Sequence, residues 1–180
     1  MRIVLVLVAV IAVVVVGFLI FVSTRPSEFR VVRSATMSAS PSVVFPLVND
    51  LRKWKDWSPW EKLDPNMKTT FEGPESGKGA MYSWVGNSNV GEGKMTITDS
   101  AANERVVLEL EFFKPMAGVS TAQFDFKPEG DGTNVTWSMN GTNNFVAKIF
   151  CVFMDMDTMI GGNFEQGLSQ LKAIVEKPAA

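Results

Sequence analysis

The sequence predicts an α+β fold in which a curved antiparallel β-sheet of about seven strands wraps around a long C-terminal helix, with one transmembrane helix in front. Three observations predict it: a long N-terminal apolar run, segments in which apolar and polar residues alternate, and a late stretch with apolar residues at steps of three and four. A sheet with one apolar face and a helix with an apolar stripe cover each other. We therefore divide the 180 residues into 1–25, a transmembrane anchor with its joint, and 26–180, one domain.

The N-terminal run Ile3–Val22 is unbroken. As a helix it spans about 30 Å, the thickness of the hydrocarbon core of a bilayer. It lacks the polar stripe of a buried core helix. A cleavable signal peptide is the alternative, although the exit from the run lacks the small-x-small cleavage pattern. We expect a retained single-pass anchor in the cell membrane, with the lipid bilayer as partner.

The orientation of this anchor is not decided by its flanking charges. Arg2 lies on one side and Arg25, Arg30 and Arg33 lie on the other. The positive-inside rule leans slightly towards a cytoplasmic domain, but long domains translocate regardless of such charges. The side of the membrane stays open.

The first part of the domain contains one strand and one short helix. Phe29–Met37 is rich in β-branched residues and predicts a strand. Ser40 is a favoured N-cap and Pro41 a favoured first helical residue. The following apolar residues predict the buried face of that helix: Val44, Phe45, Leu47, Val48 and Leu51. Pro59 stops any regular helix.

A period of two begins near residue 67 and predicts six strands separated by turn clusters. They are Met67–Phe71, Ala80–Val85, Gly93–Thr98, Arg105–Phe113, Thr121–Lys127 and Thr133–Met139. Short connections favour an antiparallel meander with one apolar face. Parity assigns the inward face to Val106, Leu108, Leu110, Phe112, Ala122, Phe124, Phe126, Val135, Trp137 and Met139.

The C-terminal segment returns to a helical period. One stripe about five turns long consists of Met156, Ile160, Phe164, Leu168, Leu171 and Val175. We interpret residues Asn143–Phe153 as an earlier segment of the same helix. The pair Gly161-Gly162 indicates a place of weakness or of close packing.

Absent residue types exclude several functions. The chain has no histidine, and Cys151 is its only cysteine. This excludes disulfides within one chain, zinc sites built on His or Cys clusters, and catalysis with an imidazole base. Apolar neighbours suggest that Cys151 is a buried, inert thiol. Net charge is −2 without a basic stripe, so we expect no nucleic-acid partner, and we expect no metal and no cofactor.

Motifs at both ends of the domain resemble the START-like helix-grip superfamily (SRPBCC), in particular its bacterial polyketide cyclase/dehydrase-like group. The opening pattern is Arg33-Ser34-Ala35-Thr36-Met37, Ala39-Ser40-Pro41, Val48-Asn49-Asp50, Trp57-Ser58-Pro59-Trp60 and Asp64-Pro65. The closing pattern is Met154-Asp155-Met156-Asp157, Gly161, Phe164-Glu165, Gly167-Leu168 and Leu171-Lys172. The resemblance covers about residues 28 to 177.

This resemblance implies a seven-stranded sheet that grips the C-terminal helix around a hydrophobic cavity. Superfamily members bind lipids, sterols, polyketides or hormones, and others are enzymes, co-chaperones or toxins, so the fold alone does not select a function. Candidates to line the cavity are Tyr82, Trp84, Met95, Ile97, Phe124, Phe126, Trp137, Met156, Ile160 and Phe164. The alternative is a filled core.

Trp54, Trp57 and Trp60 follow one another at a spacing of three. They fit the lip of a cavity or a contact with the membrane interface, where tryptophan is favoured. The alternative is that these rings plug one end of the sheet as part of the core.

The leading functional hypothesis is a membrane-anchored domain that binds an apolar or amphipathic, lipid-like small molecule between the sheet and the C-terminal helix. One alternative is an enzyme of the polyketide cyclase or dehydratase kind, and another is a protein-interaction or co-chaperone-like module at the membrane. Acid–base candidates are Tyr82, Arg33 and Glu92, each more typical of an exposed or paired side chain. We therefore assign no catalytic residue, and the missing histidine favours a binder over an enzyme.

Overall fold

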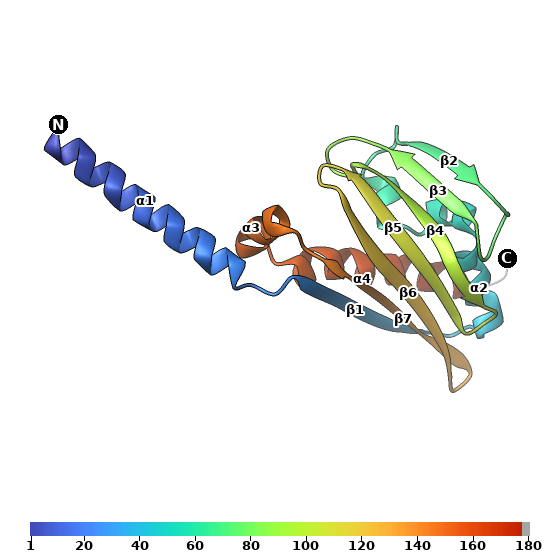
Figure 1. The fold of residues 1–180 in the computed structure, drawn as a ribbon. Coiled ribbons are helices and arrows are strands. Elements are labelled where there is room, and N and C mark those ends of the chain that lie inside the picture. Colours follow the sequence, from blue (N-terminus) through green and yellow to red (C-terminus); the bar gives the residue numbers. More distant parts are fainter. Residues whose placement is uncertain (178–180) are drawn as a thin grey trace.

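The computed structural model describes residues 1–177 and shows one rod-like helix that projects from an α+β domain (Figure 1). The elements, in order, are α1 (Arg2–Ser23), β1 (Glu28–Met37), α2 (Pro41–Asn49), the 3-10 helices η1 (Leu51–Asp56) and η2 (Pro59–Lys62), β2 (Lys68–Glu72), β3 (Met81–Val85), β4 (Glu92–Ala101), β5 (Arg105–Lys114), β6 (Gly118–Glu129), β7 (Gly132–Thr142), α3 (Phe145–Phe153) and α4 (Met156–Val175).

Helix α1 contains the predicted apolar run. It has 22 residues and a mean hydropathy of 3.6 in its most apolar window, so it is long and apolar enough to cross a membrane. Its side chains are exposed along almost the whole length, apart from Val22, which is buried. Residues 24–27 then join it to β1.

The seven strands form one antiparallel sheet in the order β1-β7-β6-β5-β4-β3-β2. The paired residues trace one rim of this sheet: Glu28 pairs with Thr142, Gly118 with Phe112, Glu92 with Lys114, and Val85 with both Glu92 and Lys68. We call this the proximal rim, because α1 joins the domain there at the start of β1. The opposite, distal rim carries the β4–β5 and β6–β7 hairpins.

Helix α4 lies along the inner face of the curved sheet (Figure 1). It runs in the same direction as β1, since Arg33 binds Asp157 near its start while the Nζ of Lys172 donates to the Thr36 carbonyl near its end. The strands alternate as predicted, with Val106, Leu108, Phe124 and Val135 buried. The predicted sheet and its helix partner are thus confirmed.

The segment before α4 differs from the prediction. Residues Phe145–Phe153 form a separate helix, α3, and the chain turns at Met154 before α4 begins. The cause is a new N-cap: the Asp155 carboxylate accepts hydrogen bonds from the Asp157 N–H and the Thr158 hydroxyl. Such a cap satisfies free N–H groups at the start of a helix, so α4 begins anew rather than continuing α3.

Candidate functional site

Aromatic rings fill the centre of the space between the sheet and α4. The Trp137 ring stacks on Phe164 of α4 at a centroid distance of 4.0 Å, and on Phe124 at 4.6 Å. All three side chains are buried. Gly167 lets α4 approach, because an added Cβ there would meet the Trp137 ring at 2.8 Å. The middle of the grip is therefore a packed aromatic layer.

The three tryptophans of the 3-10 segment border this layer. Trp54 and Trp57 lie in the core rather than on a surface, 5% and 0% exposed. Their indole N–H groups donate to the carbonyls of Val48 and Leu47. Trp60 is half-buried and packs edge-on against Trp137 and Phe164. Two of the three rings thus serve packing, the alternative that the sequence left open, while Trp60 lies at the margin.

The middle of the inner face is fully covered, and its apolar side chains become partly exposed towards the proximal rim. Along β5, Leu108 is fully buried, whereas Leu110 and Phe112, nearer the proximal rim, are half-buried. Along α4, Leu168 and Phe164 are buried, and Ile160 is half-buried. Both walls of the grip therefore present apolar side chains to solvent at the rim where α1 enters.

Tyr82 is a buried polar residue of β3, at the same level of the sheet as Met95 and Leu110 on the next two strands. Its hydroxyl donates to the Glu61 carboxylate at 2.5 Å, and its ring packs against Phe71 and Trp84. Burial, followed by the hydrogen bond to Glu61 and the negative charge of that residue, raises the pKa of Tyr82 far above its ordinary value. Tyr82 is therefore a neutral donor held by a carboxylate.

The other predicted cavity residues divide between two places. Trp84, Met95, Ile97 and Phe126 are buried on the inner face of the sheet with Tyr82. Met156 lies elsewhere, at the first turn of α4, where it borders a separate hollow. Contact of any of these residues with a ligand stays a prediction.

Trp137 carries a feature that the sequence did not indicate. Its indole Nε1 is buried and has no hydrogen-bond partner in the described part of the chain. Buried donors are nearly always paired in folded proteins. The inner face thus holds a free donor, which parity alone could place inside but could not show to be unpaired.

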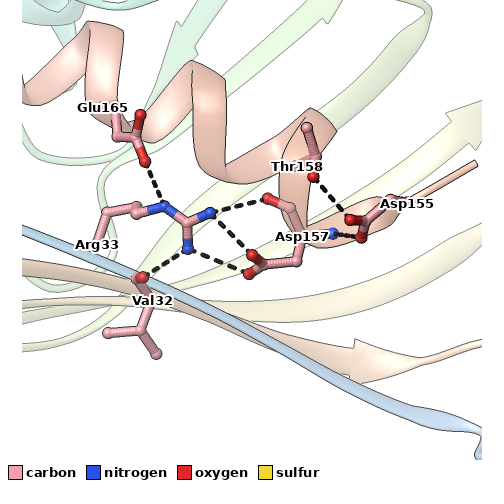
Figure 2. Close-up of polar contacts among 6 residues, drawn as sticks. All are labelled: Val32, Arg33, Asp155, Asp157, Thr158 and Glu165. Carbon is pink, nitrogen blue, oxygen red and sulfur yellow. Dashed lines mark hydrogen bonds and ion pairs between the residues drawn. The ribbon is translucent and has the colours of Figure 1, made fainter.

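Arg33 fastens β1 to α4 (Figure 2). Its Nε donates to Glu165 at 2.6 Å, and its Nη atoms donate to the Asp157 carboxylate, the Asp157 carbonyl and the Val32 carbonyl. These bonds raise the pKa of Arg33 and lower that of Asp157. All the donors of the guanidinium are engaged, so Arg33 holds structure together. Glu92 is likewise paired, with Lys114.

A hollow of about 330 Å³ lies at the junction of the α1–β1 joint, α3 and the start of α4. Arg25, Lys148, Cys151 and Asp157 are among the residues that line it. Cys151 is half-buried here and not fully buried as the sequence suggested, because its helix is only partly covered. Partial burial raises the pKa of its thiol. Within residues 1–177, no cluster of three or more cysteine and carboxylate side chains is placed to hold a metal ion.

The sequence of the domain matches one known protein family. Residues 28–176 match the family described as "Polyketide cyclase / dehydrase and lipid transport". No curated protein matches the chain in sequence.

Similar solved structures share the fold at low sequence identity. The di-domain ARO/CYC protein BexL, from the BE-7585A biosynthetic pathway, has a TM-score of 0.65 at 14% identity; the match covers 88% of this chain and 53% of BexL, about half of that longer protein. A Chromobacterium violaceum protein gives 0.57 at 16% identity over 86% of this chain and 100% of its own. The Aha1 dimer from Colwellia psychrerythraea gives 0.55 at 17% identity, over 82% and 96%. These likenesses support the helix-grip fold and leave the ligand open.

Proposed function

Because the chain belongs to the polyketide cyclase / dehydrase and lipid transport family, we propose that it is a membrane-anchored domain that binds an apolar or amphipathic, lipid-like molecule between its sheet and α4. The observation that carries this proposal is the partly exposed apolar surface of the inner face towards the proximal rim, which we call the opening. There Leu110, Phe112 and Ile160 are half-buried, whereas Leu108 of β5 and Phe164 of α4, farther from that rim, are buried.

Apolar burial would drive the binding. Removing apolar surface from water stabilises a complex by about 25 cal/mol per Å². Trp60 and Met67, both half-buried against the core, extend the apolar surface around the opening. The unpaired Nε1 of Trp137 adds support, because an oxygen atom of a bound molecule would satisfy this donor.

The anchor brings the opening close to its source of ligand. Only residues 24–27 separate α1 from β1. At about 3.5 Å per residue this joint spans at most about 14 Å. A bilayer crossed by α1 would therefore lie near the proximal rim, where lipid chains are at hand.

Photocrosslinking of the full chain tests this proposal. The protein is reconstituted in vesicles that contain phosphatidylcholine with a diazirine in its acyl chain, and adducts are mapped by mass spectrometry. We expect adducts on β5 and on the first turns of α4 in addition to α1. Adducts confined to α1 and α3, next to the bilayer, would count against binding in the grip.

Two isoleucines on α4 provide a matched pair of variants. Ile160 and Ile174 are both half-buried against the core, near the proximal and the distal end of the helix. Ile160→Gln should reduce the adducts on β5 and α4 several-fold, whereas Ile174→Gln should leave them unchanged. Equal effects of the two substitutions would indicate a general loss of packing and would overturn the assignment of the opening.

A second candidate function is an enzyme of the cyclase or dehydratase kind, favoured by the pair Tyr82 and Glu61. A buried hydroxyl and a carboxylate joined by a hydrogen bond can relay a proton to a reactive substrate held beside them. Tyr82→Phe would then abolish turnover of a poly-β-keto substrate and keep its binding. Turnover that is unchanged in Tyr82→Phe would exclude this role.

A further inference from the structure

Helix α3 presents an apolar stripe that the described part of the protein leaves largely exposed, with α1 in contact only at its Phe153 end. Val146, Phe150 and Phe153 are 52%, 47% and 74% exposed, and Ile149 is half-buried between them. These positions follow the spacing i, i+3, i+4 and i+7, so they share one face of the helix. α3 contains no fully buried residue. Its stripe is thus a surface that lacks a partner over most of its length.

The opposite face of α3 faces the protein. Lys148, Cys151 and Val152 line the hollow at the junction, together with Arg25 and Phe29. The charged and polar groups of the helix therefore point towards the domain, and the rings point away from it. A helix of a water-exposed domain usually has the reverse arrangement.

The stripe is continuous with the apolar surface of α1. The ring of Phe153 lies 5.9 Å from the ring of Phe18, and α3 packs beside the last turns of α1 (Figure 1). Phe18 lies four residues before Val22, the end of the apolar run, which corresponds to about 6 Å along a helix. Amphipathic helices at membrane interfaces bury their apolar face by about 5–10 Å. The contact places Phe153 at that depth whenever α1 spans a bilayer.

We propose that α3 is a second membrane-contacting element, an interfacial helix whose stripe Val146, Ile149, Phe150 and Phe153 inserts into the bilayer beside α1. It would fix the orientation of the domain, so that the proximal rim is held against the lipid surface. This inference rests on the anchor in the proposed function.

The charges around α3 agree with an interfacial position. The guanidinium carbon of Arg25 lies 4.3 Å from the ring centroid of Phe21, so a cation is held at the end of the apolar run, where basic side chains reach lipid headgroups. Three carboxylates, Glu28, Asp155 and Asp157, border the hollow on the opposite face of α3. Asp157 is engaged by Arg33 and Asp155 by the cap of α4, and none of the three lies on the stripe.

Nitroxide accessibility tests the proposal on the full chain in nanodiscs of phosphatidylcholine and phosphatidylglycerol. In a Cys151→Ser background, a spin label is attached at Val146→Cys and, separately, at Val43→Cys. Val43 is the matched control, a valine of 51% exposure on α2, near the distal rim. We expect the label at 146 to be reached by oxygen and shielded from a water-soluble nickel chelate. The label at 43 should be open to the chelate.

The other outcomes overturn the proposal. Equal access of the chelate to both labels would mean that α3 faces water. Shielding at 146 from oxygen and chelate alike would mean a protein contact, with a second copy or another chain as occupant. A label at Phe153→Cys, the most exposed position, should repeat the result at 146. Phe150→Glu, introduced into the variant labelled at 146, should make that label accessible to the chelate, because a charge on the stripe opposes insertion into the bilayer.

Flotation with vesicles separates this proposal from the anchor. A full chain that fails to float overturns the anchor in α1, and with it the basis for insertion of α3. A chain that floats while the label at 146 stays open to the chelate overturns the role of α3 alone. The lipid adducts on β5 and α4 from photocrosslinking test ligand binding separately, because they depend neither on flotation nor on the accessibility of the label at 146.

Discussion

The guanidinium of Arg33 lies against the backbone of Gly161, so close that a Cβ at this position would overlap its Nη2 and Cζ atoms. The glycine thereby lets the arginine reach Asp157 and Glu165 on either side of it along α4. Strand β1 is the edge strand next to the anchor, and this contact fastens it to the central helix.

Gly161→Ala should leave the domain about 1–2 kcal/mol less stable than Gly162→Ala, because the methyl group displaces a guanidinium that makes five hydrogen bonds, whereas both substitutions gain the same helix propensity. The neighbouring Gly162 is the control: it has open space around it, so Gly162→Ala should be neutral or stabilise by up to about 1 kcal/mol. Thermal unfolding of the full chain in detergent, followed by circular dichroism, measures both. Equal effects would contradict the packing described here.

The ion pair of Arg33 and Asp157 should make stability depend on pH in the acid range. The hydrogen bond from Arg33 holds the pKa of Asp157 below its ordinary value of 3.8. The resulting stabilisation is complete above 3.8 and is lost as the pH falls through the lower, folded-state pKa. Between about pH 4 and 2, the melting temperature of the wild type should fall more than that of Arg33→Gln. Parallel curves would show that the pair contributes nothing.

Tyr82 should resist ionisation while the chain is folded. It is the only tyrosine, so the ultraviolet absorbance of tyrosinate reports this one group. Its pKa is raised above the ordinary value of 10.0, mainly by burial, so its contribution to stability is present below 10.0 and is lost as the pH rises towards the folded-state value. We expect no tyrosinate signal near pH 10 in the folded chain and a normal titration in urea. A normal titration with the fold intact would contradict the buried pair.

Two buried tryptophans should respond differently to the same substitution. The Trp54 N–H donates to the Val48 carbonyl at 2.9 Å, whereas the Trp137 N–H has no partner among the described residues. Both replacements by phenylalanine remove ring volume, but only Trp54→Phe also removes a hydrogen bond. Trp54→Phe should therefore cost about 1 kcal/mol more than Trp137→Phe. Denaturant unfolding of the two variants compares them, and the opposite order would contradict these assignments.

Hydrophobic periodicity predicted most of the fold. Alternation predicts β2 to β7 and β-branched residues predict β1, all within a few residues of the observed ends, and the stripe from Met156 to Val175 coincides with α4. Apolar periodicity does not predict the break before α4, because an apolar stretch does not show where a helix ends. The signals of this break are two capping residues: Asn144 caps α3 through the Ala147 N–H, and Asp155 caps α4.

The site was less accessible to sequence reasoning. Parity could place Trp137 and Phe164 inside, but their stacking depends on how far α4 is held from the sheet. The partners of Arg33 lie more than 120 residues away along the chain, and nothing in the local sequence selects them. The exposed stripe of α3 is not predictable from its sequence alone, because the same apolar residues are typical of a buried helix face.

The antiparallel register has a practical consequence for engineering this protein. The hairpins at Ala101–Arg105 and Glu129–Gly132 both belong to the rim away from α1 and α3. Gly130 has a φ of +58° and open space around it, so the tip of the second hairpin can be lengthened without loss of a packed side chain. A reporter domain inserted there would stand away from α1 and α3 and leave that end of the molecule unaltered.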